Sequence, residues 1–281
     1  MSKRVRAAAF IFVLTTAISA CGSLSDAKDK ADTVDQAVNL LHEIDENGTW
    51  KQITDGIDNL AEQKQGFAAA FLVREGKTDS AGNFEDPLDQ GVTLAVEVDA
   101  ENNALIHVTE AGQTRDYLVE GYLDVSGPSR MYQIENGQYS CVGAGDDGGW
   151  LQNGVASVFE TYAVNAAGVQ LLSVIDEVED ETVAKRSATH YRLESRISDA
   201  VAILKKVDNS ELQQRVDAAG KFRLAGDLYL DKDTQALLRF GSRYDDLDSG
   251  RRTEFSFEIT QWGNVPDIPA PAESQIAVAC D

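Results

Sequence analysis

The chain is short of the residues that mark several common classes of protein. Its 281 residues include five prolines, three cysteines and three histidines, so neither a fibrous protein nor a zinc site rich in Cys and His is expected. Basic residues are also scarce, with 25 Lys and Arg against 47 Asp and Glu and a formal net charge of −22. A surface of that sign repels phosphate backbones, and we therefore expect no nucleic-acid partner. The hydrophobic content of 43% is nevertheless typical of a folded globular protein.

The N-terminus has the charge pattern of an export signal. Lys3, Arg4 and Arg6 form a basic start, and residues 7–20 follow without a charged side chain. This uncharged run is too short to span a bilayer as a permanent helix. We therefore expect residues 1–20 to be a signal peptide and the remainder of the chain to lie on the extracytoplasmic side of a membrane.

The signal ends in Ile18-Ser19-Ala20-Cys21, which resembles the lipobox of bacterial lipoproteins. That resemblance implies a protein of the cell envelope whose Cys21 is lipidated and anchors the chain to the membrane. An ordinary signal peptide that happens to be cleaved beside a cysteine is the alternative. Residues 21–32 are polar and lack aromatic side chains, as expected of a flexible tether between membrane and domain.

Removal of the signal changes both the charge and the cysteine count. The signal holds three basic residues and no acidic one, so the formal net charge becomes −25. If Cys21 is lipidated, Cys141 and Cys280 remain as a possible disulfide in an oxidising compartment. Two free thiols are the alternative.

The periodicity of the apolar residues predicts an α+β fold in one domain, residues 33–281. Apolar residues at helical spacing predict helices at 34–44, 49–60 and 154–164, with a broken helical insertion at 199–220 and a C-terminal tail at 264–281. Alternation with a period of two predicts strands at 67–75, 92–99, 105–110, 130–135, 138–142, 183–194, 221–230, 235–244 and 252–262. Asn136-Gly137 between two of these strands is a strong hairpin signal.

Three segments resemble the LppX/LprAFG lipoproteins and, more distantly, the LolA/LolB-like carriers. They are Thr189-His190-Tyr191-Arg192, the segment 227–234 with Leu238-Arg239-Phe240, and the segment 259–271. Tyr229 stands where that family usually has Trp. The resemblance implies a half-barrel, a strongly curved antiparallel β-sheet wrapped over N-terminal and inserted α-helices, with an apolar cavity between them.

The same resemblance implies lipid or lipidated cargo as the ligand, bound for carriage or retention without catalysis. We expect the cavity to be lined by side chains of the first helix and of the strands: Val34, Val38, Leu41, Leu94, Val96, Phe255, Phe257 and Ile259. Each of these residues also fits a role as ordinary core. An envelope interaction or scaffold protein with a filled core and no small-molecule ligand is therefore the alternative function.

Motifs for catalysis and for cofactors are weak. Residues 143–148 match GxGxxG in letters, but their two aspartates would face a pyrophosphate, so a loop is the better interpretation. His190 is expected to pack or to form hydrogen bonds, and the acidic runs at 231–233 and 245–248 lack the pattern of a calcium loop and fit turns. We expect no enzyme activity, no cofactor and no metal.

Overall fold

The computed structural model describes residues 49–81, 83–85, 91–122, 130–143, 172–195 and 222–280. The predicted signal peptide, tether and helices at 34–44, 154–164 and 199–220 lie outside these residues. So do Cys21, Val34, Val38 and Leu41.

A single large sheet dominates the described part of the chain, accompanied by one α-helix. The elements are α3 (Thr49–Glu62), β1 (Phe67–Lys77), β2 (Gly91–Val98), β3 (Ala104–Glu110), β4 (Gln113–Glu120), β5 (Arg130–Glu135), β6 (Gln138–Cys141), β7 (Leu172–Glu177), β8 (Glu181–Val183), β9 (Arg186–Ser195), β10 (Phe222–Asp231), β11 (Leu237–Asp246), β12 (Arg251–Trp262), the 3₁₀-helix η5 (Glu273–Gln275) and β13 (Ile276–Val278).

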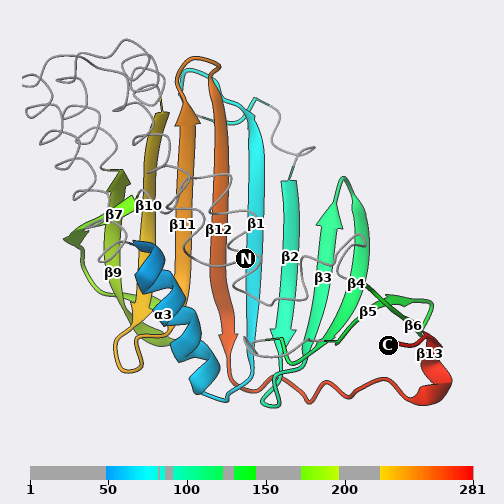
Figure 1. Ribbon diagram of the computed structural model, residues 1–281. Coiled ribbons are helices and arrows are strands. Elements are labelled where there is room, and N and C mark those ends of the chain that lie inside the picture. Colours follow the sequence, from blue (N-terminus) through cyan, green and yellow to red (C-terminus); the bar gives the residue numbers. More distant parts are fainter. Residues whose placement is uncertain are drawn as a thin grey trace, which may run out of the picture.

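The sheet is open and almost entirely antiparallel. Its thirteen strands follow the order β13-β6-β5-β4-β3-β2-β1-β12-β11-β10-β9-β7, with β8 paired to β9, and the first and last strands of this order are not joined (Figure 1). Only the short pairing of β13 with β6 is parallel among the described strands. The antiparallel sheet of the predicted fold class is therefore confirmed, and the predicted wrapping over several helices falls on residues outside the described part.

Alternation along the strands divides the sheet into two faces. In β1, Phe67, Ala69, Phe71 and Val73 are buried while their neighbours are half-buried. The register continues this inner face across the sheet, because Phe71 lies opposite Leu94 on one side and opposite Phe257 on the other. The opposite, outer face carries most of the polar and charged side chains of the same strands. We call these two surfaces the inner face and the outer face.

The helix α3 packs on the inner face across β10 and β11, in front of these strands in Figure 1. Its buried residues Ile53, Ile57 and Leu60 recur every three or four positions, which places them on one side of the helix. At Gly56 the helix comes so close that a Cβ atom would lie 3.0 Å from the Cβ of Leu237. None of the described helices is long and apolar enough to cross a membrane.

The turns between strands account for which strand predictions are confirmed and which are wrong. Asn136 and Gly137 adopt φ angles of 51° and 76° and join β5 to β6, so the predicted hairpin is confirmed. The prediction of one strand over 183–194 is wrong. Ala184 and Lys185 turn with φ angles of 50° and 66°, and the segment is the hairpin of β8 and β9. β4 was not predicted.

The C-terminal tail returns to the sheet beyond β12. Residues 264–272 contain no helix or strand and lead into η5 and β13, which pairs with β6. Two hydrogen bonds hold the start of this tail. The Asn103 side-chain amide donates to the Ile268 carbonyl oxygen (3.2 Å), and the Ile268 N–H donates to the Asp99 carboxylate (2.8 Å). Cys280 then forms a disulfide with Cys141, across a Cα–Cα distance of 5.1 Å and a sequence separation of 139 residues.

Candidate functional site

The inner face is apolar over most of its extent, and the buried polar side chains that interrupt it are Thr189, Ser242 and Thr253. The five cavity residues that the sequence predicted within the described strands all lie there at 0 to 1% exposure: Leu94, Val96, Phe255, Phe257 and Ile259. Phe71 packs against Phe257 with ring centroids 4.9 Å apart and against Phe255 at 6.3 Å. The structure thus brings these strand residues together in one cluster, and their role in holding a ligand stays a prediction.

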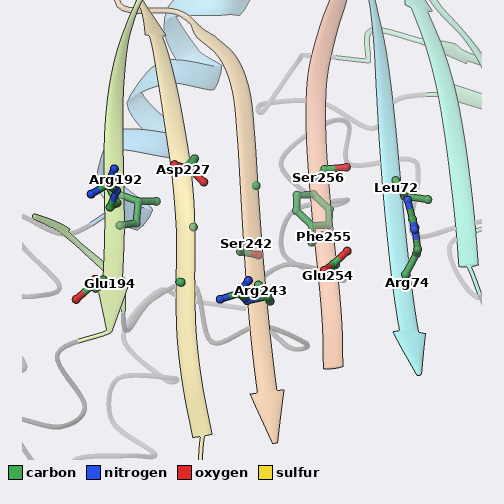
Figure 2. Close-up of a pocket in the computed structure, with 14 residues that line it drawn as sticks. Leu72, Arg74, Arg192, Glu194, Asp227, Ser242, Arg243, Glu254, Phe255 and Ser256 are labelled. Atoms are coloured by element: carbon green, nitrogen blue, oxygen red, sulfur yellow. The ribbon is translucent and has the colours of Figure 1, made fainter. Parts of the chain in front are cut away.

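The outer face carries a hollow that we call the trough. It crosses β9, β10, β11, β12 and β1 and has a volume of about 460 Å³ (Figure 2). Two rows of side chains flank it. The register aligns Arg192, Asp227, Gly241, Ser256 and Leu72 in one row, and Glu194, Ala225, Arg243, Glu254 and Arg74 in the other. Five neighbouring strands span about 19 Å, so the trough is elongated across the strands.

Small residues make the hollow. Gly241, Ala225 and Ser256 occupy outer-face positions where larger side chains would fill the space. A Cβ atom built on Gly241 would have no neighbour within 4 Å, which shows that the space above this strand is open. Glycine within a strand interior often marks such an approach site, and this signal was available from the sequence.

The charged side chains that line the trough differ in whether they have an ion-pair or hydrogen-bond partner. Asp227 bonds His190 at 2.7 Å, Arg243 pairs with Asp245 at 3.2 Å, and Glu254 lies 3.6 Å from Arg252. By contrast, Arg74 and Arg192 form no ion pair with any described carboxylate. Two guanidinium groups at opposite ends of the trough are thus left with hydrogen-bonding capacity.

A stacked group of side chains adjoins the trough on the same face. The His190 ring stacks on Tyr229 at 4.2 Å, and the Arg239 guanidinium lies over the same Tyr229 ring at 4.9 Å. Glu181 approaches both flanking residues, with its oxygens 3.5 Å from His190 Nδ1 and 3.6 Å from Arg239 Nη1. Burial, followed by the Glu181 charge, raises the pKa of the Tyr229 phenol. His190 therefore packs and bonds, as predicted.

The acidic runs form turns. The buried Asp231 carboxylate accepts hydrogen bonds from the N–H groups of Asp233 (3.1 Å) and Thr234 (2.9 Å), and it forms a two-pronged ion pair with Arg186. Burial alone would raise the pKa of Asp231, but these bonds outweigh it and lower the pKa. Asp246 likewise accepts from the Asp248 N–H at 2.9 Å. Within the described ranges, no three His, Cys, Asp or Glu side chains gather in a way that could hold a metal ion.

Comparison with known proteins finds likeness only among solved structures. No family model matches the chain, and no curated protein matches it. The lipoprotein LppX of Mycobacterium tuberculosis is 11% identical, with 78% of this chain and 97% of that chain aligned and a TM-score of 0.35. A putative outer membrane lipoprotein-sorting protein domain from Vibrio parahaemolyticus is 8% identical, with 76% and 95% aligned and a TM-score of 0.26.

A third neighbour is the MucA/MucB complex of Pseudomonas aeruginosa. It is 19% identical, with 79% of this chain aligned to 59% of that chain and a TM-score of 0.24. The lipoproteins that the sequence motifs resemble are thus found among the structural neighbours. These values carry no argument about what the chain does.

Proposed function

We propose that the chain is a lipid-anchored lipoprotein of the bacterial envelope that binds a lipid or a lipidated molecule for carriage or retention, without catalysis. The observation that carries this proposal is the inner face, an apolar surface that continues across an open sheet. An open sheet has no opposite wall of its own strands, so its apolar face needs a cover from elsewhere. Acyl chains are apolar, so a ligand that carries them can form part of that cover.

The domain layout belongs to the same proposal. Residues 1–20 are the signal peptide, Cys21 carries the anchor, residues 21–32 are the tether, and residues 33–281 form one LolA-like half-barrel domain wrapped over helices. The helical insertion at 199–220 forms the rim of the cavity mouth. In this layout Val34, Val38 and Leu41 complete the cavity that begins with Leu94, Val96, Phe255, Phe257 and Ile259.

Affinity in such a site comes from burial of apolar surface. Each Å² of apolar surface removed from water contributes about 25 cal/mol before the cost of ordering the ligand is subtracted. No charged side chain is needed on the inner face for this kind of binding, which agrees with the apolar character of Phe71, Leu94 and Phe257.

The proposal is tested by extraction of lipid from the full chain purified from its native host. Organic solvent removes bound lipid and leaves the anchor covalently attached to Cys21, so mass spectrometry of the extract counts cargo alone. We expect about one lipid or lipidated molecule per chain. A folded chain whose extract contains no stoichiometric ligand would contradict the proposal.

A pair of variants sharpens this experiment. Val96→Phe adds volume to the inner face, whereas Thr93→Phe adds the same group to the exposed outer face of the same strand. We expect Val96→Phe to reduce the amount of lipid retained or to shift it toward shorter acyl chains, and Thr93→Phe to leave it unchanged. Equal lipid profiles for both folded variants would argue against an inner-face site.

The second candidate function is an envelope interaction protein with a filled core. The near-complete burial of Phe255, Phe257 and Ile259 favours it, because side chains at 0 to 1% exposure are also what ordinary core residues show. A chain without extractable ligand that retains an envelope protein as a stoichiometric partner would support this function.

A further inference from the structure

We propose that His190 is a pH-sensitive latch that fastens the short strand β8 to the outer face. The ring lies between two carboxylates from different strands, with Nε2 2.7 Å from Asp227 on β10 and Nδ1 3.5 Å from Glu181 on β8. A ring that carries a proton on both nitrogens attracts both carboxylates at once. The inference uses contacts of the outer face alone, so it does not depend on the proposed lipid cavity.

The burial of the ring is the first observation. His190 is 8% exposed, and its Nδ1 atom is buried without a hydrogen-bond partner among the described residues. Tyr229 fixes the plane of the ring, since the two rings stack at 4.2 Å with an angle of 11° between their planes. Burial also raises the pKa of the Tyr229 phenol, so this neighbour stays uncharged near neutral pH. The imidazole is therefore held toward Asp227 and Glu181, away from water.

The protonation states of the ring differ in how they suit these two carboxylates. A neutral imidazole has one N–H donor and one lone pair, so the nitrogen without the hydrogen directs its lone pair at a carboxylate. The imidazolium has two N–H donors, and it alone suits Asp227 and Glu181 together. Histidine is the side chain whose charge changes near neutral pH. We therefore expect the latch to be closed on the acid side of that range and open on the alkaline side.

Two arginines of the outer face oppose the charge of an imidazolium. Arg239 on β11 approaches Glu181 at 3.6 Å, but its closer partner is Glu258 on β12 at 2.9 Å. Arg192 lies two residues along β9, is exposed, and is opposite Asp227 in the register (Figure 2). The two carboxylates that flank the ring favour the charged form. When the ring loses its proton, Glu181 keeps only the longer approach to Arg239.

Few other contacts hold β8 in place. It has three residues and pairs only with β9 among the described strands. An ion pair joins Asp180 to Lys232, and the Val178 N–H donates to the His190 carbonyl oxygen at 2.8 Å. Contacts of these kinds do not change protonation near neutral pH. The pH dependence is therefore assigned to Glu181 and the His190 ring, and release of β8 uncovers the backbone of β9 at residues 186–188.

The experiment is amide hydrogen exchange of the full chain in a non-ionic detergent at about pH 6 and about pH 8, corrected for the intrinsic effect of pH on exchange. An opening step coupled to one proton changes by at most about tenfold per pH unit, so we expect the protection of residues 181–183 to fall about three- to tenfold. The His190→Gln chain cannot carry the charge and should show the lower protection at both pH values. NMR of the ring nitrogens should show His190 doubly protonated on the acid side.

Two further variants separate the latch from a general effect of pH. His107 on β3 also contacts a carboxylate, Asp116 at 2.7 Å, but its side chain is 40% exposed, so His107→Gln should leave the pH dependence in place. Glu181→Gln keeps the ring and its stack, and it should abolish the pH dependence. Equal protection of residues 181–183 at both pH values in the native chain would overturn the proposal. So would a pH dependence that survives in His190→Gln or in Glu181→Gln.

Discussion

At the scale of single residues, Gly226 sets how closely β10 and β11 approach. A Cβ atom on Gly226 would lie 2.4 Å from the carbonyl oxygen of Gly241, a contact with backbone that no side-chain rotation relieves. We therefore expect Gly226→Ala to lower the free energy of unfolding by about 1 to 3 kcal/mol through overpacking. Denaturant unfolding followed by circular dichroism measures the change.

Gly241, whose carbonyl oxygen that Cβ atom would meet, supplies a matched control for this prediction. Gly241 also lies in a strand, but its Cβ atom would meet nothing within 4 Å. Gly241→Ala should consequently leave the stability unchanged or raise it slightly, since alanine restricts the unfolded chain. Equal losses for the two variants would show that the close approach at Gly226 is not the cause.

Asp231 makes stability depend on pH. Its pKa is lower in the folded chain than in the unfolded chain, because Arg186 and the turn at Thr234 stabilise the carboxylate. The contribution is therefore complete above about pH 4, the ordinary value for an aspartate, and is lost as the pH falls through the lower folded pKa. We expect Asp231→Asn to cost about 2 to 3 kcal/mol at pH 7.

The difference between native chain and Asp231→Asn should shrink as the pH is lowered from 5 to 3. Asp233→Asn is the control, because Asp233 is exposed and lies 4.0 Å from Arg186 without a hydrogen bond. Unfolding curves at several pH values measure the stability of both variants and of the native chain. A stability difference that stays constant down to pH 3 would contradict the assigned role of the Asp231 carboxylate.

At the scale of elements, local signals located most strands because one face of each is buried. The alternation in β1 and β12 and the Asn136-Gly137 turn are local features, and they are enough to define these elements. β4 begins with Gln-Thr-Arg-Asp and ends in a buried run of Tyr117, Leu118 and Val119, so it has no alternation to detect. The turn at Ala184-Lys185 has neither Gly nor Asn to mark it.

Gly241 alone can be noticed in the sequence, but the trough as a whole could not be predicted from it. Its lining residues come from five strands, and only the pairing register brings Arg192 into one row with Gly241 and Ser256. Register is a tertiary property set by the buried face and by the turns. Motif matching singled out Arg192 and Asp227 as parts of family segments and gave no reason to connect them with Arg74.

The disulfide fastens one element, β13, to the rest of the sheet. β13 has three residues and Val278 is 54% exposed, so its own packing holds it weakly. We expect Cys280→Ser to accelerate amide hydrogen exchange in residues 276–280 while β1 and β12 keep their protection. The loss of a cross-link over 139 residues should lower stability by up to about 4 to 5 kcal/mol in the chain-entropy model.

The double variant Cys141→Ser, Cys280→Ser is the control for the disulfide. Because both single variants break the same bond, we expect the double variant to unfold at the same denaturant concentration as either one. Hydrogen exchange with mass spectrometry and denaturant unfolding report the two effects. Unchanged exchange in residues 276–280 would show that hydrogen bonds alone hold β13.

At the scale of the whole molecule, the proposed anchor and the net charge would act in opposite directions. A chain that has lost residues 1–20, as proposed, carries a formal charge of −25 and is repelled by anionic headgroups, so we expect membrane attachment to depend on acylation of Cys21. An ordinary cleavable signal in place of residues 1–20, combined with Cys21→Ser, should move the protein into the soluble fraction. Fractionation measures this, and mass spectrometry of the native N-terminal peptide should show the diacylglycerol.

The native signal with Ser23→Ala provides the control, because this variant keeps Ile18-Ser19-Ala20-Cys21 intact and is expected to stay in the membrane fraction. Attachment that persists without Cys21, and that weakens as salt is added, would instead indicate electrostatic binding by the domain. Attachment that persists at all salt concentrations would point to an apolar contact. Either result would contradict dependence on the acyl anchor.

The parallel pairing of β13 has a consequence for self-association. A strand at the border of an open sheet offers unpaired N–H and C=O groups, which other chains can use to add strands. β13 occupies this position beside β6, and the Cys141–Cys280 bond keeps it there. A newly exported chain with reduced thiols would present β6 as a template for its neighbours, so the timing of thiol oxidation sets the interval during which the chain is prone to aggregate.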